Sequence, residues 1–102
     1  MIPLLETNRL AIADACARHR VARLHAFGSA GRDDYLNGSS DVDLLVEFEE
    51  MTPHDLVDAY FGLLDDLRAL LRTPVDLVML DAVKNPYVAA AIDREKRLLY
   101  AA

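Results

Sequence analysis

The sequence predicts an α/β fold in which helices pack a small mixed β-sheet, and two observations support this prediction. Segments with helical spacing alternate with short apolar segments: helix, strand, loop with room for a short helix, strand, helix, strand, helix. About thirteen residues, 28–40, connect the first two strands, which is short for the crossover between parallel neighbours. We therefore expect a mixed sheet. The chain has 102 residues, enough for one small domain, so we expect residues 1–102 to form a single domain.

The first half of the chain contains one predicted helix and two predicted strands around a polar loop. Residues 7–20 are alanine-rich with helical spacing, and residues 21–27 predict a strand that ends at Gly28. The loop 29–40 has room for a short helix and ends in a turn signal. Residues 41–48 alternate as a strand does. One face would carry Val42, Leu44, Val46 and Phe48, and the other Asp41, Asp43, Leu45 and Glu47.

The second half begins with the longest predicted helix. Thr52 can cap it, Pro53 suits its first turn, and Asp55 faces the positive end of the helix dipole. Residues 74–80 predict a strand holding one charge, residues 83–96 a last helix interrupted near its proline, and residues 98–100 an extended end. In the longest helix, apolar residues keep helical spacing for about five turns: Leu56, Val57, Tyr60, Leu63, Leu64, Leu67, Leu70 and Leu71.

Composition and charge exclude several classes of protein. Hydrophobic residues make up 53% and charged residues 27%, which is typical of globular domains and argues against disorder. No apolar run approaches the roughly 20 residues of a membrane span, and the N-terminus lacks the features of a signal peptide. The single cysteine, Cys16, excludes an intramolecular disulfide and fits the cytoplasm. The net charge of −6 disfavours a long nucleic acid but permits a nucleotide screened by a divalent cation.

Carboxylates in predicted strands are the main functional signal. Asp41 and Asp43 would lie on one face, where a cation between them relieves their repulsion. Mg²⁺ binds one or two carboxylates plus substrate phosphates, and Asp76 adds a third acid if its strand is a neighbour. Gly28-Ser29 would let backbone approach a phosphate. Each feature alone has a structural alternative, namely a loop cap, an ion pair or a turn. Their order along the chain favours a two-metal phosphoryl or nucleotidyl transfer site.

Three segments together carry a resemblance to a known family. They are Phe27-Gly28-Ser29, Ser40-Asp41-Val42-Asp43-Leu44-Leu45-Val46 and Val75-Asp76-Leu77-Val78. This pattern resembles the minimal nucleotidyltransferases of the DNA polymerase beta-like superfamily, the small MntA-type proteins, whose signature is FGS, an Ala-Arg-Gly-like spacer, SDxDLLV and a later VDLV. The likeness covers nearly the whole chain. The chain departs from it after Arg32, where Asp33 replaces the usual glycine and adds negative charge.

The resemblance implies the nucleotidyltransferase fold and a transfer of AMP. Asp41, Asp43 and Asp76 would hold two Mg²⁺ ions, and Asp76 would also help to remove the proton of the attacking hydroxyl. The residues that would bind ATP are Gly28, Ser29, Arg32 and Ser40. With no room for an acceptor-binding domain, a second chain would bring the hydroxyl. The resemblance implies an antitoxin whose partner is a HEPN-domain, HepT-like ribonuclease toxin modified on tyrosine.

Other interpretations stay open. Asp33 favours a catalytically weak antitoxin that neutralises its toxin by binding, and transfer to a small molecule is a further alternative. Glu47 is either a fourth acid near the metals or the partner of a basic residue. The sequence leaves open the acceptor residue, the number of AMP units, the base preference and the formation of a homo- or hetero-oligomer.

Overall fold

The computed structural model, which describes residues 1–28 and 41–102, contains one mixed four-stranded sheet with the strand order β3-β2-β1-β4. β1 is antiparallel to both β2 and β4, and β2 is parallel to β3. The predicted mixed sheet is therefore confirmed, and the short connection joins an antiparallel pair. The strands are β1 (Val21–Ala26), β2 (Val42–Phe48), β3 (Val75–Met79) and β4 (Arg97–Ala101).

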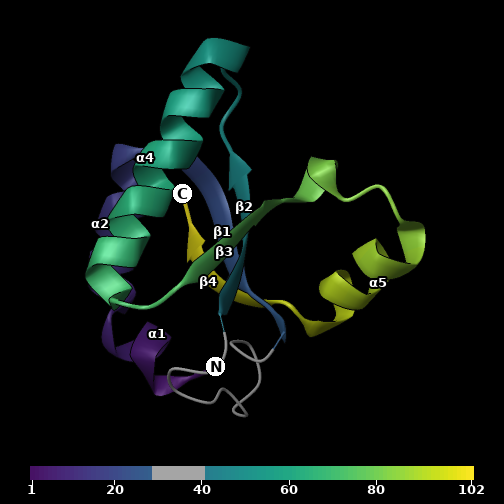
Figure 1. Ribbon diagram of the computed structural model, residues 1–102, viewed down its shortest axis with the longest axis horizontal. Helices are drawn as coiled ribbons and strands as arrows, with labels where there is room; N and C mark the ends of the chain where they lie inside the picture. Colours follow the sequence, from purple (N-terminus) through teal and green to yellow (C-terminus); the bar gives the residue numbers. More distant parts are fainter. Residues whose placement is uncertain (29–40) are drawn as a thin grey trace.

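Helices cover the two faces of the sheet unequally. Figure 1 shows α2 and α4 on one side of the sheet and α5 on the other. Within the described parts of the chain, no helix combines the length and apolar character needed to cross a membrane. The short helix considered for the loop 29–40 lies outside the described residues. The helices of the described residues are α1 (Pro3–Thr7), α2 (Arg9–Arg18), α4 (Pro53–Leu71), the 3₁₀ helix η1 (Leu80–Ala82) and α5 (Pro86–Glu95).

The helix predicted over residues 7–20 is confirmed as α2, which is two residues shorter at each end, and an unpredicted short helix, α1, precedes it, separated from it by Asn8. The side-chain amide of Asn8 donates to the carbonyl oxygen of Leu4 at 2.8 Å, and its backbone N–H bonds to Glu6. These bonds end α1, and the chain starts α2 in a new direction. Sequence periodicity did not indicate α1, since five residues with Pro3 in the first turn are too few to show a helical repeat.

The two later helices begin at side-chain caps. The hydroxyl of Thr52 accepts the backbone N–H of Asp55 at 3.3 Å, which confirms the predicted start of α4. The predicted last helix, residues 83–96, was placed too early, since α5 begins at Pro86. Proline is its first residue and not an interruption, because the side-chain oxygen of Asn85 accepts two backbone N–H groups of the first turn.

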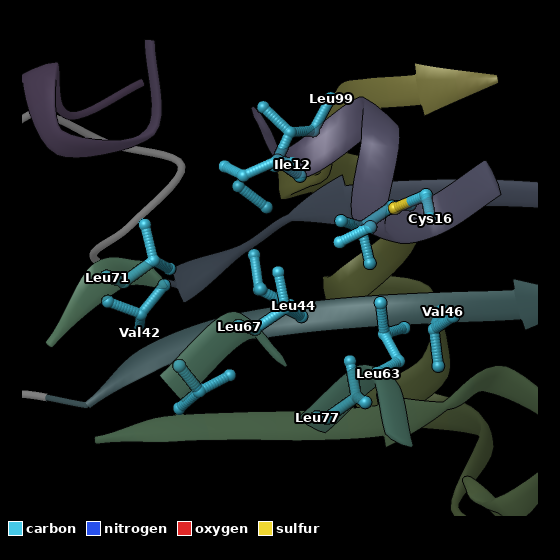
Figure 2. Packing of buried hydrophobic residues seen from close by; sticks show 14 of the residues in the cluster. Ile12, Cys16, Val42, Leu44, Val46, Leu63, Leu67, Leu71, Leu77 and Leu99 are labelled. Atoms are coloured by element: carbon cyan, nitrogen blue, oxygen red, sulfur yellow. The ribbon is translucent and has the colours of Figure 1, made fainter. Parts of the chain in front are cut away.

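The hydrophobic core lies between the sheet and the helices α2 and α4. Figure 2 shows Leu63 and Leu67 of α4 close to Leu44 of β2 and Leu77 of β3. Burying each such leucine stabilises the fold by about 1.5–3 kcal/mol relative to leaving it exposed. The predicted alternation of β2 is confirmed, because Val42, Leu44 and Val46 are all buried in this cluster. The opposite face of β2 therefore carries the acidic residues, alongside the buried Leu45.

Candidate active site

Asp43 and Asp76 lie side by side on neighbouring strands. In the parallel pair of β2 and β3, Asp43 stands opposite Asp76, so both side chains project from the same face of the sheet. Asp41 lies two residues before Asp43, directly ahead of β2, and two-residue periodicity gives it the same side. The register of the two strands thus brings the predicted carboxylates together at one end of the sheet.

The electrostatics of this group centre on Asp43. Its side chain is partly buried, whereas Asp41 and Asp76 are exposed. Burial raises the pKa of Asp43 above its ordinary value, and the charges of Asp76 and Asp41 raise it further. Both causes penalise the carboxylate form, so a cation placed among the three acids would relieve the repulsion between them.

Gly28 closes one side of the Asp43 carboxylate. The backbone N–H of Phe27 donates to the carbonyl oxygen of Asp43 at 3.1 Å, which extends the pairing of β1 and β2 to this point. Gly28 follows with φ +58°, in the left-handed region that favours glycine. A Cβ added to Gly28 would lie 2.7 Å from Oδ2 of Asp43, closer than real Cβ atoms approach other atoms. The end of β1 therefore packs its bare backbone against the carboxylate.

The donor set of this site fits Mg²⁺. Every candidate ligand here is a carboxylate oxygen, the kind of ligand that hard cations prefer. Among the residues that the structure describes, no group of three or more His, Cys, Asp and Glu side chains is arranged to hold one metal ion. A preformed structural zinc site would need such a group. Mg²⁺ needs only one or two carboxylates, with substrate phosphates and waters completing its shell, and Asp43 beside Asp76 meets that requirement.

The other residues named in the sequence prediction fall into two groups. Ser29, Arg32 and Ser40, predicted to bind the nucleotide, lie outside the described residues, as does Asp33. Glu47 is paired with a base: Nε and Nη2 of Arg23 donate to its two carboxylate oxygens at 2.9 and 3.1 Å. These bonds lower the pKa of Glu47. The ion-pair interpretation of Glu47 is therefore confirmed.

The three histidines interact with groups other than the three aspartates of the candidate site. Nε2 of His19 lies 2.7 Å from Oδ2 of Asp66, and Nε2 of His54 lies 3.6 Å from Oδ2 of Asp58. His25 is buried in β1, and burial is the main cause that lowers its pKa. The charged groups that act on Asp43 are instead the carboxylates of Asp76 and Asp41.

Tyr60 is a residue near the site that sequence reasoning treated only as an apolar position of the longest helix. Its hydroxyl donates a hydrogen bond to the backbone carbonyl oxygen of Leu77, the residue after Asp76. Helical spacing explains why Tyr60 faces the sheet, but it gives no sign of this bond. Finding it requires knowing that β3 is an edge strand, which depends on the topology of the sheet.

Comparison with known proteins identifies one family over most of the chain. The model of the family "Nucleotidyltransferase domain" matches residues 10–99. A Methanocaldococcus jannaschii protein, provisionally named protein adenylyltransferase MJ0128, is 41% identical over 78 residues, 76% of each chain. A solved structure provisionally described as a minimal nucleotidyltransferase is 35% identical with a TM-score of 0.68, covering 91% of this chain and 93% of that one.

Two toxin–antitoxin crystal structures share the fold at lower identity. One, described as a toxin–antitoxin with AMP-PNP, is 20% identical with a TM-score of 0.72 and covers 93% of this chain and 74% of that one. The other, of the toxin–antitoxin MntA-HepT, is 18% identical with a TM-score of 0.64, covering 95% and 73%. At this level of identity, the likeness is one of fold.

Proposed function

Because the chain belongs to the nucleotidyltransferase domain family, we propose that it transfers AMP from ATP to a hydroxyl group of a partner protein. The observation that carries this proposal is the pair Asp43 and Asp76, set opposite each other in β2 and β3 with Gly28 packed against Asp43. This arrangement places carboxylates beside a strand end suited to phosphate. The relative named as an adenylyltransferase, 41% identical, supports AMP as the transferred group.

In this proposal, different residues bind the nucleotide and accept the proton of the attacking hydroxyl. The backbone of Gly28, with Ser29, Arg32 and Ser40, binds the triphosphate of ATP. Two Mg²⁺ ions, when bound to the three aspartates, supply positive charge for the triphosphate and the leaving pyrophosphate. The exposed Asp76 accepts the proton of the attacking hydroxyl. A bond forms between that oxygen and the α-phosphorus, the bond to the β-phosphate oxygen breaks, and pyrophosphate leaves in line with the attack.

The acceptor that we propose is a tyrosine of a HEPN-type, HepT-like toxin, which makes the chain an antitoxin. Two observations support this choice. Toxin–antitoxin structures, including MntA-HepT, share the fold. The net charge of −6 also complements a basic partner, as a protein that binds RNA is expected to be. On this proposal residues 1–102 act as one domain, and the toxin brings the reacting hydroxyl to Asp76.

The test is a labelling experiment with ATP that carries a labelled α-phosphate. The purified chain is incubated with its co-purifying partner and Mg²⁺, and two variants are compared. Asp43→Asn removes a proposed ligand, whereas Asp65→Asn makes the same change on an exposed position of α4. We expect the partner to gain mass in whole AMP units on tyrosine with the wild type and Asp65→Asn, and not with Asp43→Asn or after chelation of Mg²⁺.

The same experiment separates the alternatives. An unlabelled partner in a tight complex that forms without nucleotide would contradict the transfer and favour an antitoxin that acts by masking its toxin. Label on a small molecule and none on the partner would favour the small-molecule transferase. Equal labelling by Asp43→Asn and the wild type would remove the carboxylates from the mechanism.

A further inference from the structure

The strand that carries Asp76 is at the edge of the sheet. In the strand order β3-β2-β1-β4, β3 pairs with β2 on one side and with none of the other described strands on the other. The carbonyl oxygen of Pro74 accepts the N–H of Val42 at 3.0 Å, so it points toward β2. Because carbonyl directions alternate along a strand, the carbonyl of Asp76 also points toward β2, and that of Leu77 points toward the free edge. Edge strands are held by one ladder of hydrogen bonds only.

Tyr60 supplies a bond to this free edge. Its hydroxyl donates to the carbonyl oxygen of Leu77, so the outward-facing acceptor next to Asp76 is satisfied from α4. The ring of Tyr60 is partly buried against the core and meets the ring of Phe61 edge to face, with centroids 5.1 Å apart and planes at 87°. α4 itself is anchored by Leu63, which is fully buried. The bond therefore connects the edge strand to a helix that is packed into the core.

We propose that Tyr60 is a positioning residue for Asp76. This inference rests on the proposed function, in which Asp76 accepts the proton of the attacking hydroxyl. The ladder with β2 sets Asp76 opposite Asp43, and the bond from Tyr60 fixes the following peptide on the other side of the strand. Without that bond β3 is held from one side, and Asp76 samples positions that are displaced from the acceptor. Misplacement of a reacting group by a fraction of an ångström lowers the rate of transfer.

The test is the variant Tyr60→Phe, which removes one hydroxyl and keeps the ring. The matched control is Tyr100→Phe, the same change on a partly buried ring of β4, the edge strand at the other end of the sheet. We expect kcat for AMP transfer to fall about tenfold in Tyr60→Phe, while KM for ATP stays within about twofold. We also expect faster amide hydrogen exchange at residues 76–78. Tyr100→Phe should match the wild type in both measurements.

The separation of kcat from KM distinguishes positioning from a general loss of stability. A kcat for Tyr60→Phe within about twofold of the wild type, or an equal fall in Tyr100→Phe, would overturn the proposal. If the wild type itself transfers no AMP, the proposed function fails, and hydrogen exchange decides the positioning role by itself. Unchanged exchange at residues 76–78 in Tyr60→Phe would then overturn it, and faster exchange confined to β3 would support it.

Discussion

Replacing Gly28 by alanine tests whether the end of β1 fixes the Asp43 carboxylate. The added Cβ would lie 2.7 Å from Oδ2 of Asp43, whereas ordinary contacts begin near 3.4 Å, so the carboxylate or the backbone must move by about 0.7 Å, the difference between these distances. The backbone φ of +58° costs alanine a further 1–2 kcal/mol, roughly, because its Cβ is crowded in the left-handed region. Displacing a reacting group by about 1 Å costs about 10²-fold in rate. Scaled to about 0.7 Å, this predicts a fall in kcat of about 10- to 50-fold.

The assay measures AMP transfer and thermal unfolding of Gly28→Ala beside Gly62→Ala. At Gly62, in α4, the added Cβ would meet Cε1 of His19 at 2.6 Å, but that ring is a side chain that can turn away. Gly62→Ala should change the melting temperature and keep kcat within about twofold. Gly28→Ala should lower the melting temperature by about 4–8 °C for each kcal/mol lost. Wild-type kcat in Gly28→Ala would refute the argument that contact with Gly28 fixes the carboxylate.

Three further predictions concern charge and burial. Burial, followed by the two neighbouring aspartates, raises the pKa of Asp43, so the folded protein loses stability as pH rises from the ordinary value of 3.8 through the raised one. Without Mg²⁺, Asp43→Asn should therefore melt above the wild type at about pH 7, and the difference should vanish near about pH 3 in thermal unfolding curves. Burial raises the pKa of Cys16 to about 12, so iodoacetamide at about pH 8 should label it only after unfolding in urea, as mass spectrometry would show. Glu47→Gln breaks an exposed pair with Arg23 and should cost about 0.5 kcal/mol in urea unfolding with no change in kcat, whereas a large loss of kcat would favour the alternative in which Glu47 is a fourth acid near the metals.

The fold was predictable where local chemistry decides it. The alternation of residues 41–48 and the cap at Thr52 each have a direct physical cause in the neighbouring residues, and both predictions were confirmed. The short helix α1 was missed, because its five residues show no helical repeat, and the start at Arg9 is marked by side-chain and backbone bonds of Asn8 to the preceding turn. Pro86 was placed inside a helix, because the pattern of apolar residues does not show that Asn85 caps the chain at that point.

Sequence patterns single out the three aspartates as candidates, but they do not give the contacts between them. Two-residue alternation places Asp41 and Asp43 on one face, but their approach to Asp76 depends on β3 pairing in parallel with β2, which periodicity does not determine. The contact of Gly28 with Asp43 depends on the curvature of the chain at the end of β1. The sequence indicated that the backbone at Gly28 could approach a phosphate. Its packing against a carboxylate appears only in the folded structure.

The two faces of β2 explain how a small sheet holds three acids that repel one another. Val42 and Leu44 are buried in the core on either side of Asp43, so burial of apolar neighbours fixes the backbone that carries the carboxylate. Each such burial contributes about 1.5–3 kcal/mol to the free energy of folding. These apolar contacts, which involve no cation, therefore fix the backbone of Asp43. On the proposed function, cation binding would relieve repulsion between carboxylates whose backbone is already fixed, which would leave more of the binding energy for orienting the substrate.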